Sequence, residues 1–245
     1  RHESLDRAIR AANIWISRHA LVGTNIGSDS ANEIYERIVK QLASASVSGS
    51  DKGMTKSTNL AKFLRTLSKE NEKFAKFGFT SPLRIKSIIN SIKSAKGANK
   101  STITNILNPY LEGIEARLNA LNEVQMVTES FLNTFNDFFF DKDVSFNVSS
   151  GLQIKTKEGV LLEPSVLSSG EQQLLLLFCY TIISRDNPSI FIIDEPELSL
   201  NVKWQRRIIK SLLDLVAGSE MQFFFATHSL ELITQYRKNV ERLNP

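Results

Sequence analysis

The sequence contains one cysteine, Cys179, among its 245 residues. A single thiol excludes a disulfide framework and disfavours a cysteine-based zinc site, and it is typical of a reducing cytosol, so we expect a cytoplasmic protein. No apolar run approaches the roughly 18–20 residues of a membrane-spanning helix, and we expect no membrane partner. The N-terminus has neither a signal-peptide pattern nor an initiator Met, so we expect the chain to begin inside a longer protein.

The basic residues are unevenly distributed. The formal net charge is +4, yet residues 52–100 carry twelve Lys or Arg against two acids, Glu70 and Glu72, a local net of 12 − 2 = +10. Such an excess is often only the solvated face of a helix. It is also the pattern of a surface that meets nucleic acid phosphates or an acidic partner. Both interpretations stay open at this stage.

Residues 1–140 read as helices. Apolar residues recur at spacings of three and four over 4–20, 31–42, 60–67, 82–95 and 108–139. Two prolines are predicted to begin their helices, Pro82 and Pro109. Residues 43–53, rich in Ser and Gly, predict a loop. Four phenylalanines near the end predict buried core, namely Phe131, Phe135, Phe138 and Phe139. We expect a helical insertion or arm, with coiled-coil potential, that contains the basic segment 52–100.

After residue 140 the periodicity changes. Residues 144–148 alternate apolar and polar, and turns at Gly151 and Glu158-Gly159 predict a short antiparallel meander. Beyond it, two predicted helices alternate with two wholly apolar strands, at 170–183, 204–216, 190–193 and 223–226. Such strands are typical of a parallel sheet covered on both faces. The predicted fold class is α/β, with residues 141–245 as one domain behind the helical residues 1–140.

The strongest motif is Ser-Ile-Phe-Ile-Ile-Asp-Glu-Pro, residues 189–196. Ligands of parallel sheets bind beyond the C-terminal ends of the strands. Asp194 at such an end can hold Mg²⁺ together with nucleotide phosphates. Glu195 can orient or deprotonate the water that attacks a γ-phosphate. The structural alternative is a strand that simply ends in a polar turn.

A second motif places Ser168, Ser169, Gly170, Glu171 and Gln172 before an apolar helix. Free N–H groups and the positive end of the helix dipole favour an anion there. Taken alone, the segment would be an ordinary serine cap.

In the third motif, an apolar strand, residues 223–226, ends in Thr-His-Ser. A lone histidine is more often structural than functional. Its place about thirty residues after the Asp-Glu strand instead predicts that His228 senses phosphate.

In their order and spacing the three motifs resemble the C-terminal half of the ABC-class ATPase domain, over about residues 144–235. The resemblance implies ATP and Mg²⁺ as cofactors, Asp194 as the Walker B aspartate, Glu195 as the catalytic glutamate and His228 as the switch histidine. It assigns residues 168–172 to the signature motif, which contacts ATP across a head-to-tail dimer with a second copy of the chain. Leu198-Ser199-Leu200 lies at the position of the D-loop.

Details within these motifs indicate a branch. The apolar helix after the signature, and Asp-Glu-Pro-Glu-Leu-Ser-Leu at 194–200, are similar to ATPases of the SMC, DNA-repair and OLD group, which includes ATPases of the Septu and retron phage-defence systems. Two residues depart from the pattern. Ser169 replaces the usual first glycine of the signature, and Asn201 stands where many relatives have His.

A phosphate-cradling loop of the form G-x-x-x-x-G-K-[S/T] is missing. The nearest segment, residues 49–57, has the wrong spacing and follows no apolar strand, so we interpret it as a flexible loop. We therefore expect the ATPase site to be incomplete in this chain and an N-terminal lobe with that loop to precede Arg1.

The resemblance implies an ATPase that controls a DNA-directed activity, such as a nuclease partner or fused nuclease domain in anti-phage defence. Alternatives are a DNA-repair or chromosome-maintenance ATPase, a transporter nucleotide-binding domain, or a scaffold with little turnover. Retention of Glu195 favours hydrolysis over a purely structural role.

Overall fold

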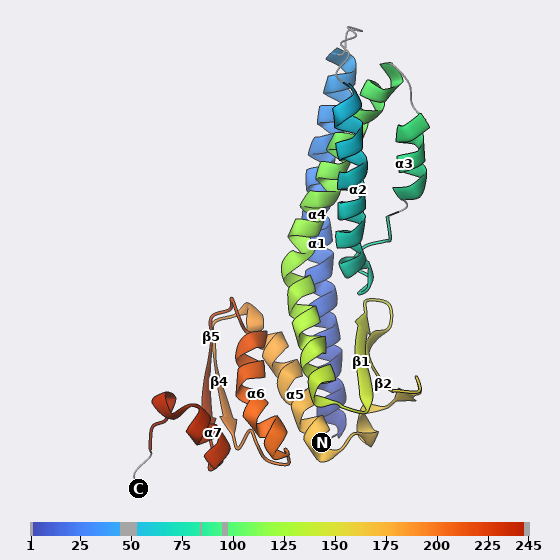
Figure 1. The fold of residues 1–245 in the computed structure, drawn as a ribbon. Coiled ribbons are helices and arrows are strands. Elements are labelled where there is room, and N and C mark those ends of the chain that lie inside the picture. Colours follow the sequence, from blue (N-terminus) through green and yellow to red (C-terminus); the bar gives the residue numbers. More distant parts are fainter. Residues whose placement is uncertain (1, 45–52, 84, 95–97, 243–245) are drawn as a thin grey trace. The chain divides into compact units, whose positions relative to one another are not determined.

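Figure 1 shows the computed structural model, which describes residues 2–44, 53–83, 85–94 and 98–242. The chain divides into two compact units. Unit 1 comprises residues 1–16, 127–146 and 150–245, and unit 2 comprises residues 17–126 and 147–149. Two long helices, α1 (His2–Ser44) and α4 (Ala98–Phe138), contribute residues to both units. Within the described ranges, no helix combines the length and the apolar character needed to cross a bilayer.

Unit 2 is helical. Besides its parts of α1 and α4 it contains α2 (Gly53–Ala75) and α3 (Ile85–Ser94). Four apolar residues of α2 fall on one face and are buried, namely Leu60, Leu64, Leu67 and Phe74. Gly23 of α1 lies so close to α4 that an added Cβ would stand 2.9 Å from the carbonyl oxygen of Ala120. The absence of a side chain at Gly23 therefore lets these two backbones approach each other.

Three predicted boundaries in the helical region are wrong. The helix is continuous through residues 21–30, α3 begins at Ile85 rather than at Pro82, and Pro109 lies inside α4. Proline removes one helical hydrogen bond, but Pro109 is buried. Tertiary packing on either side of it keeps the helix continuous where local sequence predicts a start. Most of the predicted loop 43–53 lies outside the described residues.

Unit 1 has two small sheets, the helices α5, α6 and α7, and parts of α1 and α4. The first sheet has the order β1 (Lys142–Asn147), β2 (Gly151–Thr156), β3 (Leu161–Leu162), and β2 pairs antiparallel with β3. Then follow α5 (Ser169–Ile183), β4 (Ser189–Asp194), α6 (Val202–Leu215), β5 (Met221–Ala226) and α7 (Leu230–Gln235). Strands β4 and β5 pair in parallel, as predicted. The α/β fold class with a parallel sheet after a helical region is confirmed.

An aromatic cluster joins the helices of unit 1. Phe135 at the end of α4 meets Phe178 of α5 edge to face, with ring centroids 5.4 Å apart. Phe138 contacts Trp204 of α6 in the same manner at 5.7 Å. Phe131 and Phe139 are also buried, so the prediction that these four phenylalanines form core is confirmed. Such pairs add to the burial of apolar area and fix the relative positions of α4, α5 and α6.

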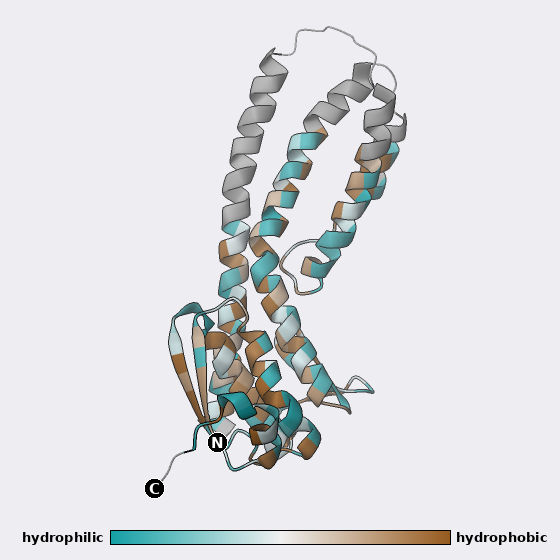
Figure 2. Ribbon diagram, turned by 60° about the vertical axis from the view of Figure 1, so that its left-hand side comes forward, coloured by the Kyte–Doolittle hydropathy of each residue, from teal (hydrophilic) through white to brown (hydrophobic). Residues whose placement is uncertain are grey.

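Only one face of the β4–β5 sheet is covered within the described residues. Helices α5 and α6 lie on one side of the sheet in both Figure 1 and Figure 2. On the strands, exposed residues alternate with half-buried ones, and the exposed set includes Ile190, Ile192 and Phe224 at 64%, 76% and 50% exposure. The prediction that both faces are covered is therefore wrong. Wholly apolar strands predict burial, but the described residues supply a layer for one side only.

Candidate functional site

The two parallel strands bring the first and third motifs to one edge of the sheet. Asp194 is the register partner of Ala226, so the segments after both strands begin side by side. The Glu195 amide donates a hydrogen bond to the Ala226 carbonyl at 2.8 Å and extends the pairing by one residue. This edge is where parallel sheets bind ligands.

Glu195 and His228 face each other across this edge. The His228 Nε2 atom lies 3.8 Å from the Glu195 Oε1 atom, and the two side chains are 98% and 33% exposed. Glu195 has a positive φ of 47°, a conformation that costs a non-glycine residue about 1–3 kcal/mol and that clusters at functional sites. The predicted catalytic pair is thus within reach of one ligand.

The Glu195 carboxyl titrates above its ordinary range. Desolvation is the main cause of its raised pKa, and hydrogen bonding to Glu197 and the charge of Glu197 raise it further. The imidazole of His228 acts in the opposite direction. A raised pKa makes a carboxylate a stronger base, which suits a group that accepts a proton from water.

Asp194 is the last residue of β4 and is exposed, on the same face of the sheet as Ile190 and Ile192. No group of three or more His, Cys, Asp or Glu side chains that could enclose a metal occurs in the described ranges. Mg²⁺ in nucleotide sites commonly uses one or two carboxylates and takes its other ligands from phosphates and water. An exposed carboxylate at a strand end fits that role.

Sequence reasoning missed Glu197. Its side chain is buried, at 7% exposure, and its Oε1 atom accepts hydrogen bonds from the Thr227 hydroxyl and from the Ser229 amide at 3.1 Å. These two donors flank His228. The available signal was a second acid in Asp-Glu-Pro-Glu, but only the fold shows that it points inward.

The start of α5 forms a complete capping box. Ser168 accepts from the Glu171 amide, while the Glu171 carboxylate accepts from the amide and the hydroxyl of Ser168 at 2.8 and 2.9 Å. Lys142 also donates to Glu171 at 2.8 Å, and both side chains of this ion pair are largely buried. Glu171 is therefore a structural carboxylate here, with its partners supplied by unit 1.

The other predicted signature residues take separate roles. Ser169 is exposed, and Gln172 donates its side-chain amide to the Leu167 carbonyl at 2.9 Å. A Cβ at Gly170 would stand 2.6 Å from the carbonyl oxygen of Ser199, which has a φ of 66°. Glycine is thus required for close packing of the α5 start on the 195–200 loop.

The structure therefore joins the motifs in pairs. Glu195 and His228 meet directly, and the α5 start contacts the loop after β4 through Gly170 and Ser199. Among the described residues, no contact joins Asp194 to Ser168 or Ser169. The roles assigned to individual residues stay predictions.

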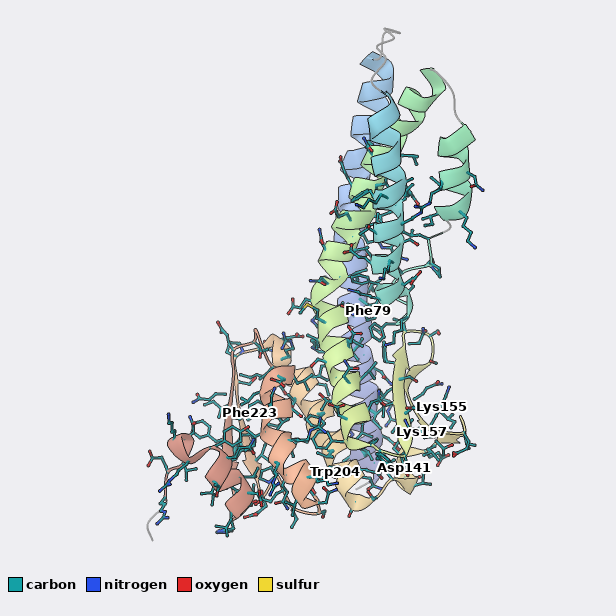
Figure 3. All side chains as sticks on the ribbon, viewed as in Figure 1. Phe79, Asp141, Lys155, Lys157, Trp204 and Phe223 are labelled. Carbon is teal, nitrogen blue, oxygen red and sulfur yellow. The ribbon has the colours of Figure 1, made fainter. Side chains whose placement is uncertain are left out.

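Asn201, one of the two departures, has a local explanation. Its side chain accepts a hydrogen bond from the Trp204 amide at 3.0 Å and caps α6. Trp204 and Asp141, both labelled in Figure 3, help to line a cavity of about 580 Å³ with Phe140 and Glu171. Phe140 is 95% exposed at this cavity.

Residues 68–234, more than half of the chain, match the family model described as "AAA domain, putative AbiEii toxin, Type IV TA system". The chain belongs to this AAA-domain family. The match confirms the predicted ATPase domain at the level of the AAA/ABC class.

Curated relatives share a shorter region. The chain is 36% identical over 69 residues to the lipoprotein-releasing system ATP-binding protein LolD 1 of Rhodospirillum rubrum, which is 28% of this chain and 29% of that protein. The LolD protein of Cereibacter sphaeroides is also 36% identical over 69 residues, 28% of this chain and 30% of its own. The chain thus spans less than a third of the length of these relatives.

Solved structures of SMC heads are also similar to the chain. The SMC head domain from Thermotoga maritima has 24% identity and a TM-score of 0.33, over 47% of this chain and 42% of that one. The Smc head of Pyrococcus furiosus with an extended coiled coil, bound to the C-terminal domain of ScpA, has 16% identity and a TM-score of 0.36, over 90% and 51%.

Proposed function

We propose that the chain supplies the hydrolytic half of an ATP-hydrolysing site, with residues 141–245 as its C-terminal lobe and residues 1–140 as a helical insertion or arm. In this proposal Asp194 holds Mg²⁺, Glu195 is the base for the attacking water and His228 contacts the γ-phosphate. The observation that carries it is the 3.8 Å approach of His228 to Glu195 at the strand end where Asp194 is exposed.

The uncovered sheet face supports an incomplete site. Ile190, Ile192 and Phe224 are exposed on the face that carries Asp194. Apolar surface of this kind favours burial against another layer. We infer that a further segment covers this face and brings the phosphate-cradling loop beside Asp194. Residues 49–57 are the segment of this chain most similar to a phosphate-cradling loop. Of these, residues 53–57 lie in α2, and no strand precedes them in the described ranges.

The signature segment supports completion by a second copy of the chain. Ser169 is exposed at the N-terminus of the fifteen-residue helix α5, where helix amides and the helix dipole favour an anion. In the proposed head-to-tail dimer, residues 168–172 of one copy face the ATP held by the other. The hydroxyl of Ser168 is engaged with Glu171, so Ser169 and the helix amides are the better phosphate contacts.

The decisive experiment replaces Glu195 with Gln in the full-length protein. We expect loss of ATP turnover and accumulation of ATP-bound dimers, measured by phosphate release and by size-exclusion chromatography with ATP and Mg²⁺. Glu163→Gln, at an exposed position before α5, is the matched control and should leave both unchanged. Unchanged turnover in Glu195→Gln would contradict the catalytic assignment.

A basic stripe on α2 supports a nucleic acid partner. Four exposed basic side chains of α2 follow one another every three or four residues, Lys62, Arg65, Lys69 and Lys73, and the exposed Lys76 follows directly after the helix ends. This spacing places the four on one helix face over about 16.5 Å, at a rise of about 1.5 Å per residue, opposite the buried Leu64 and Leu67. A linear array of cations with no apolar centre suits a phosphate backbone better than a protein surface.

The salt dependence of binding tests this partner. If all five cations contact phosphates, log affinity for duplex DNA should fall with log salt with a slope of about −4.5, and Lys69→Gln/Lys73→Gln should reduce the size of the slope by about 2. The control variant Arg237→Gln/Lys238→Gln removes the same charge from another exposed segment and should not change the slope. If binding to duplex DNA and to RNA is absent or does not depend on salt, the basic stripe is only the solvated face of a helix.

The proposed output is control of a nucleic-acid-directed activity in the cytoplasm, with a nuclease partner or fused nuclease in anti-phage defence, or DNA repair or chromosome maintenance as the alternative. The family description, which names a putative toxin of a toxin–antitoxin system, supports the defence reading. Stimulation of ATP turnover by DNA would distinguish the defence role and the repair or chromosome-maintenance role from a low-turnover scaffold.

The identity to LolD favours a second candidate, a transporter nucleotide-binding domain. The apolar residues 174–178 after the signature speak against it, because transporter domains usually carry an Arg- and Ala-rich helix at this point. Copurification with a membrane protein, without any response to DNA, would favour the transporter.

A further inference from the structure

Glu197 links the segments that follow β4 and β5. Its buried carboxylate accepts hydrogen bonds from the Thr227 hydroxyl and the Ser229 amide, thirty and thirty-two residues further along the chain. The Thr227 hydroxyl in turn accepts from the Ser229 amide at 3.0 Å. One acid therefore fixes the residues on both sides of His228.

The imidazole of His228 depends on this backbone for its position. Its side chain is 98% exposed, so packing does not hold the ring. The 3.8 Å approach to Glu195 is longer than a hydrogen bond and does not hold it either. The position of the His228 ring therefore depends on the backbone of the flanking residues Thr227 and Ser229. Both of these residues are hydrogen bonded to Glu197.

A second link reinforces the same segment. The Ser229 hydroxyl donates to the Gln205 Oε1 atom at 3.1 Å, and the Gln205 amide donates to the Leu200 carbonyl at 3.0 Å. The segment after β5 is thus tied to the loop after β4 at two points, one of them through α6.

The burial of Glu197 has an energetic cost. Its Oε2 atom is buried and accepts no hydrogen bond from an amide or hydroxyl in the described part of the chain. An unsatisfied buried oxygen costs about 1–3 kcal/mol, and such costs concentrate at functional sites. Stability alone would favour an apolar residue here.

We infer that Glu197 is a positioning residue that sets His228 against Glu195 and so couples the γ-phosphate contact to the catalytic base. The inference rests on the proposed ATPase function. Glu197 needs no contact with substrate, since it acts through the 227–229 backbone and through its hydrogen bond with the Glu195 carboxyl.

The test compares Glu197→Ala, Glu197→Gln and Thr227→Val in the full-length protein. We expect Glu197→Ala to lower kcat for ATP about 10- to 100-fold with little change in KM, because misplacement of a catalytic group costs this much. Glu197→Gln keeps an acceptor oxygen for both donors and should restore kcat to within about threefold of wild type. Thr227→Val removes one bond and should lie between them.

Two outcomes would overturn the inference. One is an equal loss in Glu197→Ala and Glu197→Gln, and the other is wild-type kcat in a folded Glu197→Ala. Thermal unfolding checks that each variant is folded, and Glu231→Ala, which removes an exposed carboxylate paired with Arg206, is the control.

A nucleotide-free measurement separates this inference from the proposed function. The NMR resonances of the His228 ring should shift in Glu197→Ala and return toward wild type in Glu197→Gln. If wild type shows no turnover, the proposed function fails, while this pattern still supports the positioning role. Unchanged His228 resonances in Glu197→Ala would contradict the positioning role of Glu197.

Discussion

The polar side chains at the start of α5 are paired with one another, whereas those at the ends of β4 and β5 are partly or fully exposed. At α5 the side chains of Ser168, Glu171 and Lys142 are paired with one another. At the strand ends, Glu195 has a positive φ and His228 is almost fully exposed. The first region is complete as a structure, whereas the second leaves polar groups exposed, as the proposed contact with ATP requires. Under the proposed function, one family motif therefore serves stability at the start of α5, and the others serve chemistry at the strand ends.

The largest effect is expected from removing the carboxylate that completes the α5 start. Glu171→Ala leaves the largely buried Lys142 with only Asp141 and removes the two hydrogen bonds that the Glu171 carboxylate accepts from the amide and the hydroxyl of Ser168. We expect a loss of about 3 kcal/mol, at the lower end for a broken buried pair because Asp141 remains. Urea unfolding measures it. A loss below about 1 kcal/mol would contradict the structural role of Glu171.

Gly170→Ala should have the next largest effect, at the contact between the two regions. The new methyl group would overlap the backbone carbonyl of Ser199, which cannot rotate away as a side chain can. Overpacking of this kind costs about 1–3 kcal/mol. Unfolding by urea would show the loss, and the exposed Ser169→Ala is the neighbouring control. If both variants are equally stable, the close packing at Gly170 is not required.

The smallest effect concerns the open region and has the opposite sign. The folded pKa of Glu195 is raised, so its contribution to stability is fully present below the unfolded pKa and is lost as pH rises through the folded pKa. The glutamine side chain of Glu195→Gln does not ionise, so this variant does not lose stability in this way as pH rises. We expect its unfolding midpoint to exceed that of wild type slightly at neutral pH, with the difference vanishing in acid. A midpoint below wild type at neutral pH would show that Glu195 stabilises the fold.

Sequence reasoning predicted the α/β block well and the helix boundaries poorly. The apolar strands and the helices between them have strong local patterns, and Asp194, Glu195 and His228 occupy the predicted strand ends. The boundary at Pro109 could not be predicted, because burial of that residue inside α4 depends on neighbours distant in sequence. Glu197 was missed for the same reason, since its donors lie thirty residues away.

Local sequence patterns suffice to predict the order of the three motifs, the strand character of residues 189–194 and 221–226, and the amphipathic pattern of α2, since periodicity and residue chemistry act locally. Three features emerge only from the fold: Glu195 lies near His228, Gly170 packs on Ser199, and the described residues leave one face of the β4–β5 sheet uncovered. Parallel pairing and helix packing join residues about thirty positions apart, and no local pattern encodes which of their atoms come into contact.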